Sequence, residues 1–574
     1  MSKKTILGKF ALVLHSHLPY VIEHGVWPHG MDWLFEAASE TYIPILKAMN
    51  RLIREGISPK VTIGITPVLV EQLKDKAFQD GFKVYLENKI KVSRDDKRQF
   101  EEWGDKHLLS LACMWEDFYN TILTLFKEDY KEDIVGAFKM LQDMGHIEII
   151  TSCATHGYLP LIGRDTAVQA QIKQGIQTYR RYFERDPKGI WLPECAYRPR
   201  YKWKSPIGGD DGVMRKGIEE FLSENKIEYF IIDSHLLKGG NAIGVYMDRF
   251  ESLKKLWGQF EKEYKPRHED VEKCPHEVYY VGSVEGKKPV AVFTRDPKTG
   301  MQVWSGEYGY PGDEWYLEFH KKRFPGGLRY WRVTGSKSDL ADKSEYEPDR
   351  VSERIEENAN HFKWLIKTTL KECNHTQGIV CAPFDAELFG HWWFEGPEWI
   401  YRVLRLIHDD PELELSTCGG HLDSQTKETV VVSLPEGSWG EGGFHWIWLN
   451  EWTMWTWKHV YEAEKEMERL ARELNGTGDE KLETILKQAA RELLLLESSD
   501  WQFLISTWSA RDYAEIRVTG HYHDFKKLSD MAWRYSRDKR LNEGDWNFLA
   551  SCQKRDSIFS DIDVGWFSKV EFPI

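Results

Sequence analysis

Two stretches of the chain end an apolar run at a proline and then present a carboxylate. The first delivers Glu194 and the second delivers Asp385. In α/β barrels the catalytic groups lie where strands end at the C-terminal face, and both carboxylates would lie there. Taken alone, Glu194 has a simpler interpretation as the ion-pair partner of Arg198 or Arg200. The second stretch, with the same pattern, is what favours a catalytic role.

Polar side chains follow three further predicted strands. His15 and His17 follow the first strand, and because alternate residues of an extended chain face the same way, both imidazoles would point together. His156 follows the third strand and Arg295 follows the sixth. The C-terminal ends of parallel strands share one face of a sheet, so we expect these groups and the two carboxylates to form one site.

Two kinds of chemistry fit this set of residues. A His-x-His pair with a distant His and Asp would form a divalent metal site for hydrolysis. Alternatively, one carboxylate is the nucleophile of a glycoside-cleaving enzyme, the other is the acid/base, and the histidines hold sugar hydroxyls. The chain contains 25 Trp, 25 Tyr and 27 Phe, and many of the Trp lie beside Gly and acids. Flat indole faces suit the C–H faces of sugar rings, which favours the glycoside chemistry.

The elements that must position these groups alternate between strands and helices, which predicts an α/β fold with a parallel sheet. Most of the strand-like segments are near-continuous apolar runs, typical of parallel strands buried on both faces. Long connections favour an incomplete (β/α)7 barrel, and the rival, an open doubly wound sheet, lacks a GxGxxG motif after any strand. The seven predicted strands are Phe10–Leu14, Val61–Ile65, Ile147–Thr151, Ile190–Leu192, Tyr229–Ile232, Val290–Thr294 and Ile379–Pro383.

Three regions are expected along the chain. The catalytic barrel would comprise residues 1–235 and 288–405. Residues 236–287 are too long for a plain crossover and indicate a small inserted subdomain, a mobile lid carrying Tyr246 at the mouth of the barrel. Residues 406–574 turn largely helical and would form a C-terminal domain that contributes to the substrate cleft.

Bulk composition excludes several classes of protein. The chain has 574 residues, more than one hydrophobic core usually serves, and its net charge of −14 argues against a nucleic-acid partner. It shows no basic, apolar leader and no run near the ~18 apolar residues of a membrane helix, so we expect a soluble, cytoplasmic protein with no membrane partner. Its eight Cys include no CxxC pair, which predicts reduced, mostly buried thiols and gives no zinc-site spacing. The oligomeric state is not set by the sequence, and a monomer is favoured.

Five motifs occur in a fixed order along the chain. They are His15–Tyr20 (HSHLPY), Ala154–Pro160 (ATHGYLP), Trp191–Tyr197 (WLPECAY), Phe384–Trp393 (FDAELFGHWW) and Glu497–Trp501 (ESSDW). Together they resemble the five signature regions of glycoside hydrolase family fifty-seven, and within it the 1,4-α-glucan branching enzymes. The resemblance spans nearly the whole chain. It implies an incomplete barrel with a small insertion and a helical C-terminal domain, and a retaining mechanism without a metal or other cofactor.

Carried over position by position, the resemblance implies Glu194 as the nucleophile and Asp385 as the acid/base. Glu387, two residues further on, would face the same side of an extended chain, and only the family pattern prefers Asp385. The implied substrate contacts are His15, His17, His156, Arg295, Gly312, Trp439 and Asp500, with sugar platforms at Trp304 and Trp448 and a loop tyrosine at Tyr246.

The implied activity is cleavage of α-1,4 bonds and transfer of the released chain to a 6-hydroxyl, which forms an α-1,6 branch. The expected partner is therefore an α-glucan polysaccharide such as amylose, amylopectin or glycogen. A 4-α-glucanotransferase or an α-amylase-type hydrolase of the same family is the nearest alternative. From other classes, a metal-dependent carbohydrate deacetylase and a non-catalytic glucan-binding protein compete with it.

Overall fold

All seven predicted strands are present in one parallel arrangement. The computed structural model describes residues 6–208, 211–238, 273–282, 288–305, 308–335, 337–373, 378–425 and 430–570. The strands are β1 (Gly8–Ser16), β2 (Val61–Ile65), β3 (Ile147–Ser152), β4 (Gly189–Trp191), β7 (Tyr229–Ile232), β9 (Val290–Thr294) and β10 (Gly378–Asp385). Every residue of β2, β4, β7 and β9 is buried, as expected for strands covered on both faces.

The strands follow the order β10-β1-β2-β3-β4-β7-β9 around a curled sheet. The two ends of this path, β9 and β10, meet in a single isolated bridge between Arg295 and Cys381, where Asp296 N donates to Cys381 O at 2.9 Å. A ladder of hydrogen bonds joins each of the other neighbours, so the ring has a seam between β9 and β10. The prediction of an incomplete seven-stranded barrel is confirmed.

Short strands extend the sheet beyond the predicted seven. The edge strand β8 (Tyr279–Val281) pairs antiparallel with β9, β12 (Val431–Val432) pairs with β8, and β11 (Leu413–Leu415) pairs with β1. Because β8 belongs to the sheet, the segment expected as a lid returns to the barrel before residue 288. The strands β11 and β12 lie after residue 406, within the region that was expected to be largely helical.

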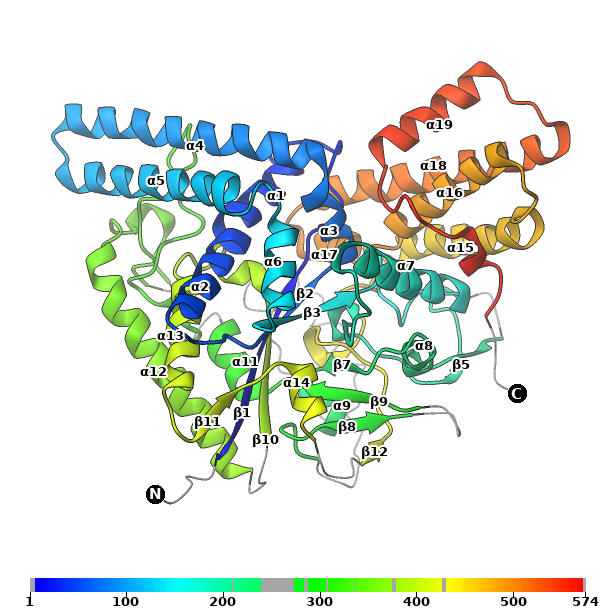
Figure 1. The fold of residues 1–574 in the computed structure, drawn as a ribbon. Helices are drawn as coiled ribbons and strands as arrows, with labels where there is room; N and C mark the ends of the chain where they lie inside the picture. The colour runs from blue at the N-terminus through cyan, green and yellow to red at the C-terminus, as the bar shows by residue number, and fades with distance from the viewer. Residues whose placement is uncertain are drawn as a thin grey trace.

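Helices surround the sheet on its outer side. The helices α2 (Ile43–Arg54), α12 (Pro348–Glu372) and α13 (Gly396–His408) pack near β10 and β1, and each buries one apolar stripe. The helices α4 (Lys76–Trp103) and α5 (Lys106–Thr124) form a long antiparallel hairpin at the upper left of Figure 1. Gly104 ends α4 at φ +72°, where a residue without a Cβ turns the chain at no steric cost.

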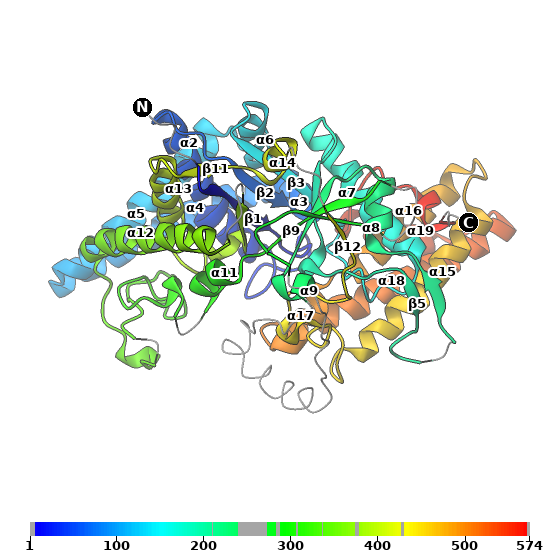
Figure 2. The same ribbon diagram turned by 90° about the horizontal axis from the view of Figure 1, so that it is seen from below.

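The C-terminal helices gather on the opposite side of the sheet from α12 and α13 (Figure 2). They are α15 (Met454–Leu474), α16 (Glu480–Leu496), α17 (Asp500–Thr507), α18 (Arg511–Asp538) and α19 (Glu543–Arg555). The apolar face that the sequence predicts within Leu482–Leu494 is buried in α16, against α15 and α18. The short helix α17 begins at Asp500 and carries that residue to the strand ends.

Residues 239–272 lie outside the described residues, and with them the expected lid and Tyr246. In the part of the chain that is described, no helix has the length and apolar character needed to cross a membrane.

Candidate active site

Glu194 lies on a sharp turn directly after β4. Pro193 ends the strand, and the chain then adopts left-handed backbone angles at two consecutive non-glycine residues, with φ +59° at Glu194 and +48° at Cys195. His156, after β3, has φ +59° as well. Such angles cost a non-glycine residue about 1–3 kcal/mol each and persist where the surroundings fix them, often at functional sites. The turn leaves the Glu194 side chain 15% exposed at the end of the barrel.

Three groups surround the Glu194 carboxylate. The indole Nε1–H of Trp439 donates to Oε2 at 2.8 Å, the Ser499 hydroxyl donates to Oε1 at 3.3 Å, and His156 Nδ1 lies 3.9 Å from Oε1. The neighbouring arginines are used elsewhere, since Arg200 pairs with Glu220 and Arg198 lies 3.7 Å from Asp165. The simpler interpretation of Glu194, as a partner of these arginines, is therefore wrong.

The pKa of Glu194 is raised to about 7, chiefly because burial disfavours the charged carboxylate. The hydrogen bond from Trp439 opposes this and lowers the pKa. The negative charges of Asp385 and Asp500 raise it further, and the charge of His17 lowers it. The carboxylate of Asp385 therefore lies close enough to Glu194 for the two charges to interact.

The three predicted histidines come together in one stack. The rings of His17 and His156 are 4.0 Å apart, those of His15 and His156 are 5.0 Å apart, and His15 stacks on Trp191 at 4.5 Å. His15 Nε2 and His156 Nε2 share a hydrogen bond of 3.0 Å. Burial holds the pKa of both rings well below the usual value, so His15 and His156 are neutral at pH 7.

His17 differs from its two neighbours because it faces an acid. Its Nε2 lies 2.9 Å from Asp500 Oδ2 and its Nδ1 lies 3.1 Å from Thr66 Oγ1, just beyond β2. Burial lowers the pKa of His17, but the charge and hydrogen bond of Asp500 outweigh it, so the pKa is raised above its usual value. The helical domain thus supplies the partner that makes one histidine of the stack more basic than the others.

Asp385 ends β10, where it pairs in register with His15 of β1. The chain turns into a 3-10 helix over Ala386–Leu388, so Glu387 does not continue the alternation of the strand. The Glu387 carboxylate accepts hydrogen bonds from Tyr42 Oη at 2.5 Å and from the backbone N of His17 at 3.0 Å. Glu387 is therefore engaged in holding the His17 segment, and its pKa is raised to about 7 by burial.

Arg295, at the end of β9, reaches the same group of residues. Its guanidinium lies 5.8 Å from the centre of the Trp439 ring and donates from Nη1 to Asp233 Oδ2 at 3.2 Å. Asp233 follows β7 and was not predicted, although it too is an acid at the end of a predicted strand. Burial would raise the pKa of Asp233, and hydrogen bonding and charge from His235 and Arg295 hold it well below the usual range instead.

Two predicted sugar platforms are buried, and a third predicted substrate contact lies in an exposed turn. Trp448 is fully buried, stacks on Tyr158 at 4.4 Å and packs in the core, so it presents no open face for a sugar in this conformation. Trp304, at the end of α11 (Pro297–Trp304), is only 6% exposed and belongs to the hydrophobic core. Gly312 is exposed in a 3-10 turn, and Tyr310 of the same turn packs against Phe362 of α12.

Two residues that contact the predicted site residues, Ser499 and Trp191, were not predicted from the sequence. Ser499 bonds both Glu194 and His156 Nδ1, the latter at 3.0 Å, and it lies inside a motif that was noticed only for its neighbour Asp500. Trp191 lies inside another such motif and stacks beneath His15. Their positions within the motifs are the signal that identifies them.

A curled parallel barrel that carries a buried carboxylate, a second interacting acid and a stack of imidazoles at its strand ends is the arrangement expected of a glycoside-cleaving enzyme. Comparison with known proteins agrees. Residues 11–435 match the profile described as glycosyl hydrolase family 57, and residues 459–567 match one described as 1,4-alpha-glucan branching enzyme, C-terminal. The chain belongs to glycosyl hydrolase family 57.

Relatives cover the full length of the chain. It is 42% identical over 563 residues to a 1,4-alpha-glucan branching enzyme of Thermococcus kodakarensis, spanning 97% of this chain and 78% of that protein. The crystal structure of a branching enzyme from Pyrococcus horikoshii superposes with a TM-score of 0.88 at 40% identity, covering 99% of this chain and 98% of the other. That of the alpha-amylase AmyC from Thermotoga maritima superposes with a TM-score of 0.80 at 28% identity, covering 98% and 100%.

Proposed function

We propose that this protein is a 1,4-α-glucan branching enzyme that works by retaining double displacement on amylose, amylopectin or glycogen. The observation that carries the proposal is the full-length similarity to branching enzymes, through both the barrel and the helical C-terminal region. The site supports it with two interacting carboxylates, Glu194 and Asp385, at the ends of β4 and β10.

In the first step, Glu194 attacks the anomeric carbon while Asp385 gives its proton to the glycosidic oxygen. Retaining enzymes hold two such carboxyls about 5–5.5 Å apart, which leaves no room for a water between them. The Trp439 N–H and the Ser499 hydroxyl orient the attacking carboxylate, because each binds one of its two oxygens. A glucosyl ester on Glu194 and a departed glucan chain result.

In the second step, Asp385 takes a proton from the acceptor, and the acceptor oxygen displaces Glu194. A 6-hydroxyl as acceptor gives an α-1,6 branch, a 4-hydroxyl gives chain disproportionation, and water gives hydrolysis. The outcome depends on how well water is excluded and how the acceptor chain is held. Trp439 stands next to Glu194 and under Arg295, so it is placed to shield the intermediate.

Hydrolysis is the second candidate function, because the chain also resembles the Thermotoga maritima alpha-amylase along its whole length. Proton NMR of the products made from amylose separates the two activities. New α-1,6 anomeric signals without a matching rise in reducing ends support branching. Reducing ends without α-1,6 signals would overturn the proposal in favour of a hydrolase.

A further inference from the structure

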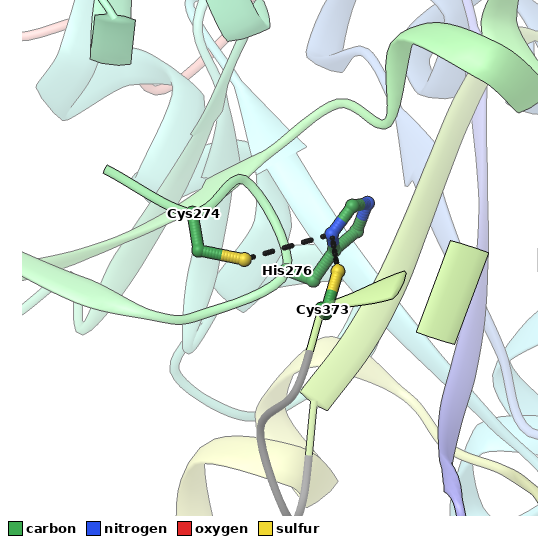
Figure 3. Close-up of side chains that lie close together, drawn as sticks. All are labelled: Cys274, His276 and Cys373. Atoms are coloured by element: carbon green, nitrogen blue, oxygen red, sulfur yellow. Dashed lines mark hydrogen bonds between the residues drawn. The ribbon is translucent and has the colours of Figure 1, made fainter. Parts of the chain in front are cut away.

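Two cysteines and a histidine from two distant parts of the sequence lie close together at the seam of the barrel (Figure 3). Cys274 and His276 lie in the segment that leads into β8, and Cys373 caps the C-terminus of α12. The Sγ atoms of Cys274 and Cys373 lie 3.7 Å and 2.6 Å from His276 Nδ1. Both cysteines are half-buried, so an ion from solvent can reach their sulfur atoms.

The imidazole is oriented from behind by a carboxylate. His276 Nε2 donates to Asp296 Oδ1 at 2.8 Å, and Asp296 is almost fully buried. Histidines that bind metals commonly donate their second ring N–H to a carboxylate in this way, which leaves the other nitrogen free to coordinate. Two thiols and one imidazole form a ligand set that selects zinc among the common divalent ions.

We propose that Cys274, His276 and Cys373 bind one zinc ion that fastens the seam between β9 and β10. Zinc–sulfur and zinc–nitrogen bonds of about 2.3 and 2.1 Å at tetrahedral angles place S and N about 3.6 Å apart. The spacing from Cys274 to His276 already fits, and Cys373 needs to retreat by about 1 Å. Three protein ligands leave one coordination position for water or a further side chain.

The environment of the three side chains changes the pKa values of His276 and Cys373. Burial would lower the pKa of His276, but Asp296 and the Cys274 thiolate raise it to about 9. The pKa of Cys373 is raised to about 12 by burial. Zinc binds thiolates and neutral imidazole, so its binding releases the protons that these side chains carry in the free protein.

An ion at this position would link several elements of the barrel. His276 O accepts the backbone N–H of Ile379 at the start of β10, and Asp296 N donates to Cys381 O of the same strand. The Asp296 side chain also caps α11 through Thr299 N at 2.7 Å. A zinc ion here would tie β10, α12 and the corner after β9 together, where β9 and β10 share only one isolated bridge.

A second cluster in the described part of the chain is less suited to a metal ion. His24, His521 and Asp556 lie together, but Arg555 binds the Asp556 carboxylate and Arg517 the His521 ring. These cations would repel a metal ion. In the cysteine and histidine cluster, the imidazole instead contacts the two thiols and the Asp296 carboxylate. In the sequence, Cys373 is followed by His375 at the spacing that joins Cys274 to His276; His375 lies outside the described residues, so the site is defined by the other three.

Metal content tests the site without reference to the glucan chemistry. Purified protein is stripped with a chelator under reducing conditions, reloaded with zinc sulfate, desalted and measured by mass spectrometry of metals. We expect one zinc per chain in the wild type, and near-complete loss in Cys274→Ser and Cys373→Ser. Cys113→Ser, at a half-buried cysteine on α5, is the matched control and should keep its zinc.

Cobalt chloride gives a second readout that a merely unfolded variant cannot imitate. Cobalt in the wild type should show thiolate-to-metal charge-transfer bands, which weaken in each single variant while circular dichroism stays unchanged. Zinc should also raise the melting temperature of the stripped wild type by a few degrees and leave that of Cys373→Ser unchanged. A wild type that retains no zinc, or that retains it equally in both serine variants, would overturn the site. So would a Cys274–Cys373 disulfide that persists in reducing buffer.

Discussion

Replacing Trp439 with phenylalanine removes one hydrogen bond from Glu194 and keeps an aromatic ring beside it. The indole N–H lies 2.8 Å from Glu194 Oε2, and it is the largest single influence that lowers the pKa of this carboxyl. A hydrogen bond to a charged group contributes about 1.5–3 kcal/mol. One pKa unit corresponds to about 1.4 kcal/mol, so the pKa of Glu194 should rise by about 1–2 units.

The direction in which the activity of Trp439→Phe changes follows from the role of Glu194 as the nucleophile. A nucleophile must be ionised, so kcat/KM falls as pH drops below the pKa of Glu194, which is about 7 in the free enzyme. In Trp439→Phe the acidic limb of the profile should move to higher pH by about 1–2 units. At pH 6, kcat/KM should therefore fall about 10- to 100-fold through ionisation alone.

The assay is the initial rate of glucan transfer at low concentrations of a maltooligosaccharide, measured from pH 4 to pH 9. Ser499→Ala is the matched control, because its hydroxyl lies 3.3 Å from the other carboxylate oxygen and donates a weaker bond. Its acidic limb should move less than that of Trp439→Phe. An acidic limb that stays in place in Trp439→Phe, whatever the loss in absolute rate, would refute the assignment of Glu194 as the ionised nucleophile.

Three further predictions concern the same cluster. Glu194→Gln keeps the hydrogen bond to Trp439 but removes the nucleophile, so transfer should fall by about 10⁴-fold or more with an unchanged circular dichroism spectrum; substantial residual turnover of amylose would remove Glu194 from the role. Asp500→Asn removes the charge that keeps the pKa of His17 raised, and losing a charged hydrogen bond should lower kcat/KM about 10- to 100-fold; an unchanged kcat/KM would show that this pair is only structural. Trp439→Ala opens the site to water, so NMR should show a higher ratio of reducing ends to α-1,6 signals, and an unaltered product profile would contradict the shielding role.

The barrel could be predicted because its strands are buried on both faces. Strands such as β2 and β9 are then largely apolar, which makes them recognisable in the sequence as short apolar runs. The α4–α5 hairpin could not be placed in the same way. Its helical periodicity says that one face is buried, but not that two helices between β2 and β3 pair with each other.

The residues of the site could be predicted from the sequence, but their conformations and mutual contacts could not. The His15–His17 pair and the two acids followed from strand ends and from recognised motifs. The left-handed backbone at Glu194 did not, because such angles are imposed by surroundings and not by residue type. The burial of Trp448 was equally hidden, since a Trp beside polar residues in sequence can still face inward.

The cluster of Cys274, His276 and Cys373 could not be predicted either, because it depends on contacts between residues far apart in the sequence. Spacing rules for zinc apply to ligands on one local loop, whereas Cys373 joins the other two only when α12 packs beside the segment before β8. No motif rule applied to the eight cysteines would have brought them together.

The most direct test of the central claim is to trap the covalent intermediate. The enzyme is incubated with an activated 5-fluoroglucosyl fluoride, digested, and its peptides are sequenced by mass spectrometry. A glycosyl group esterified to Glu194 is the expected result. An adduct on any other residue, or products whose anomeric configuration is inverted, would contradict the account.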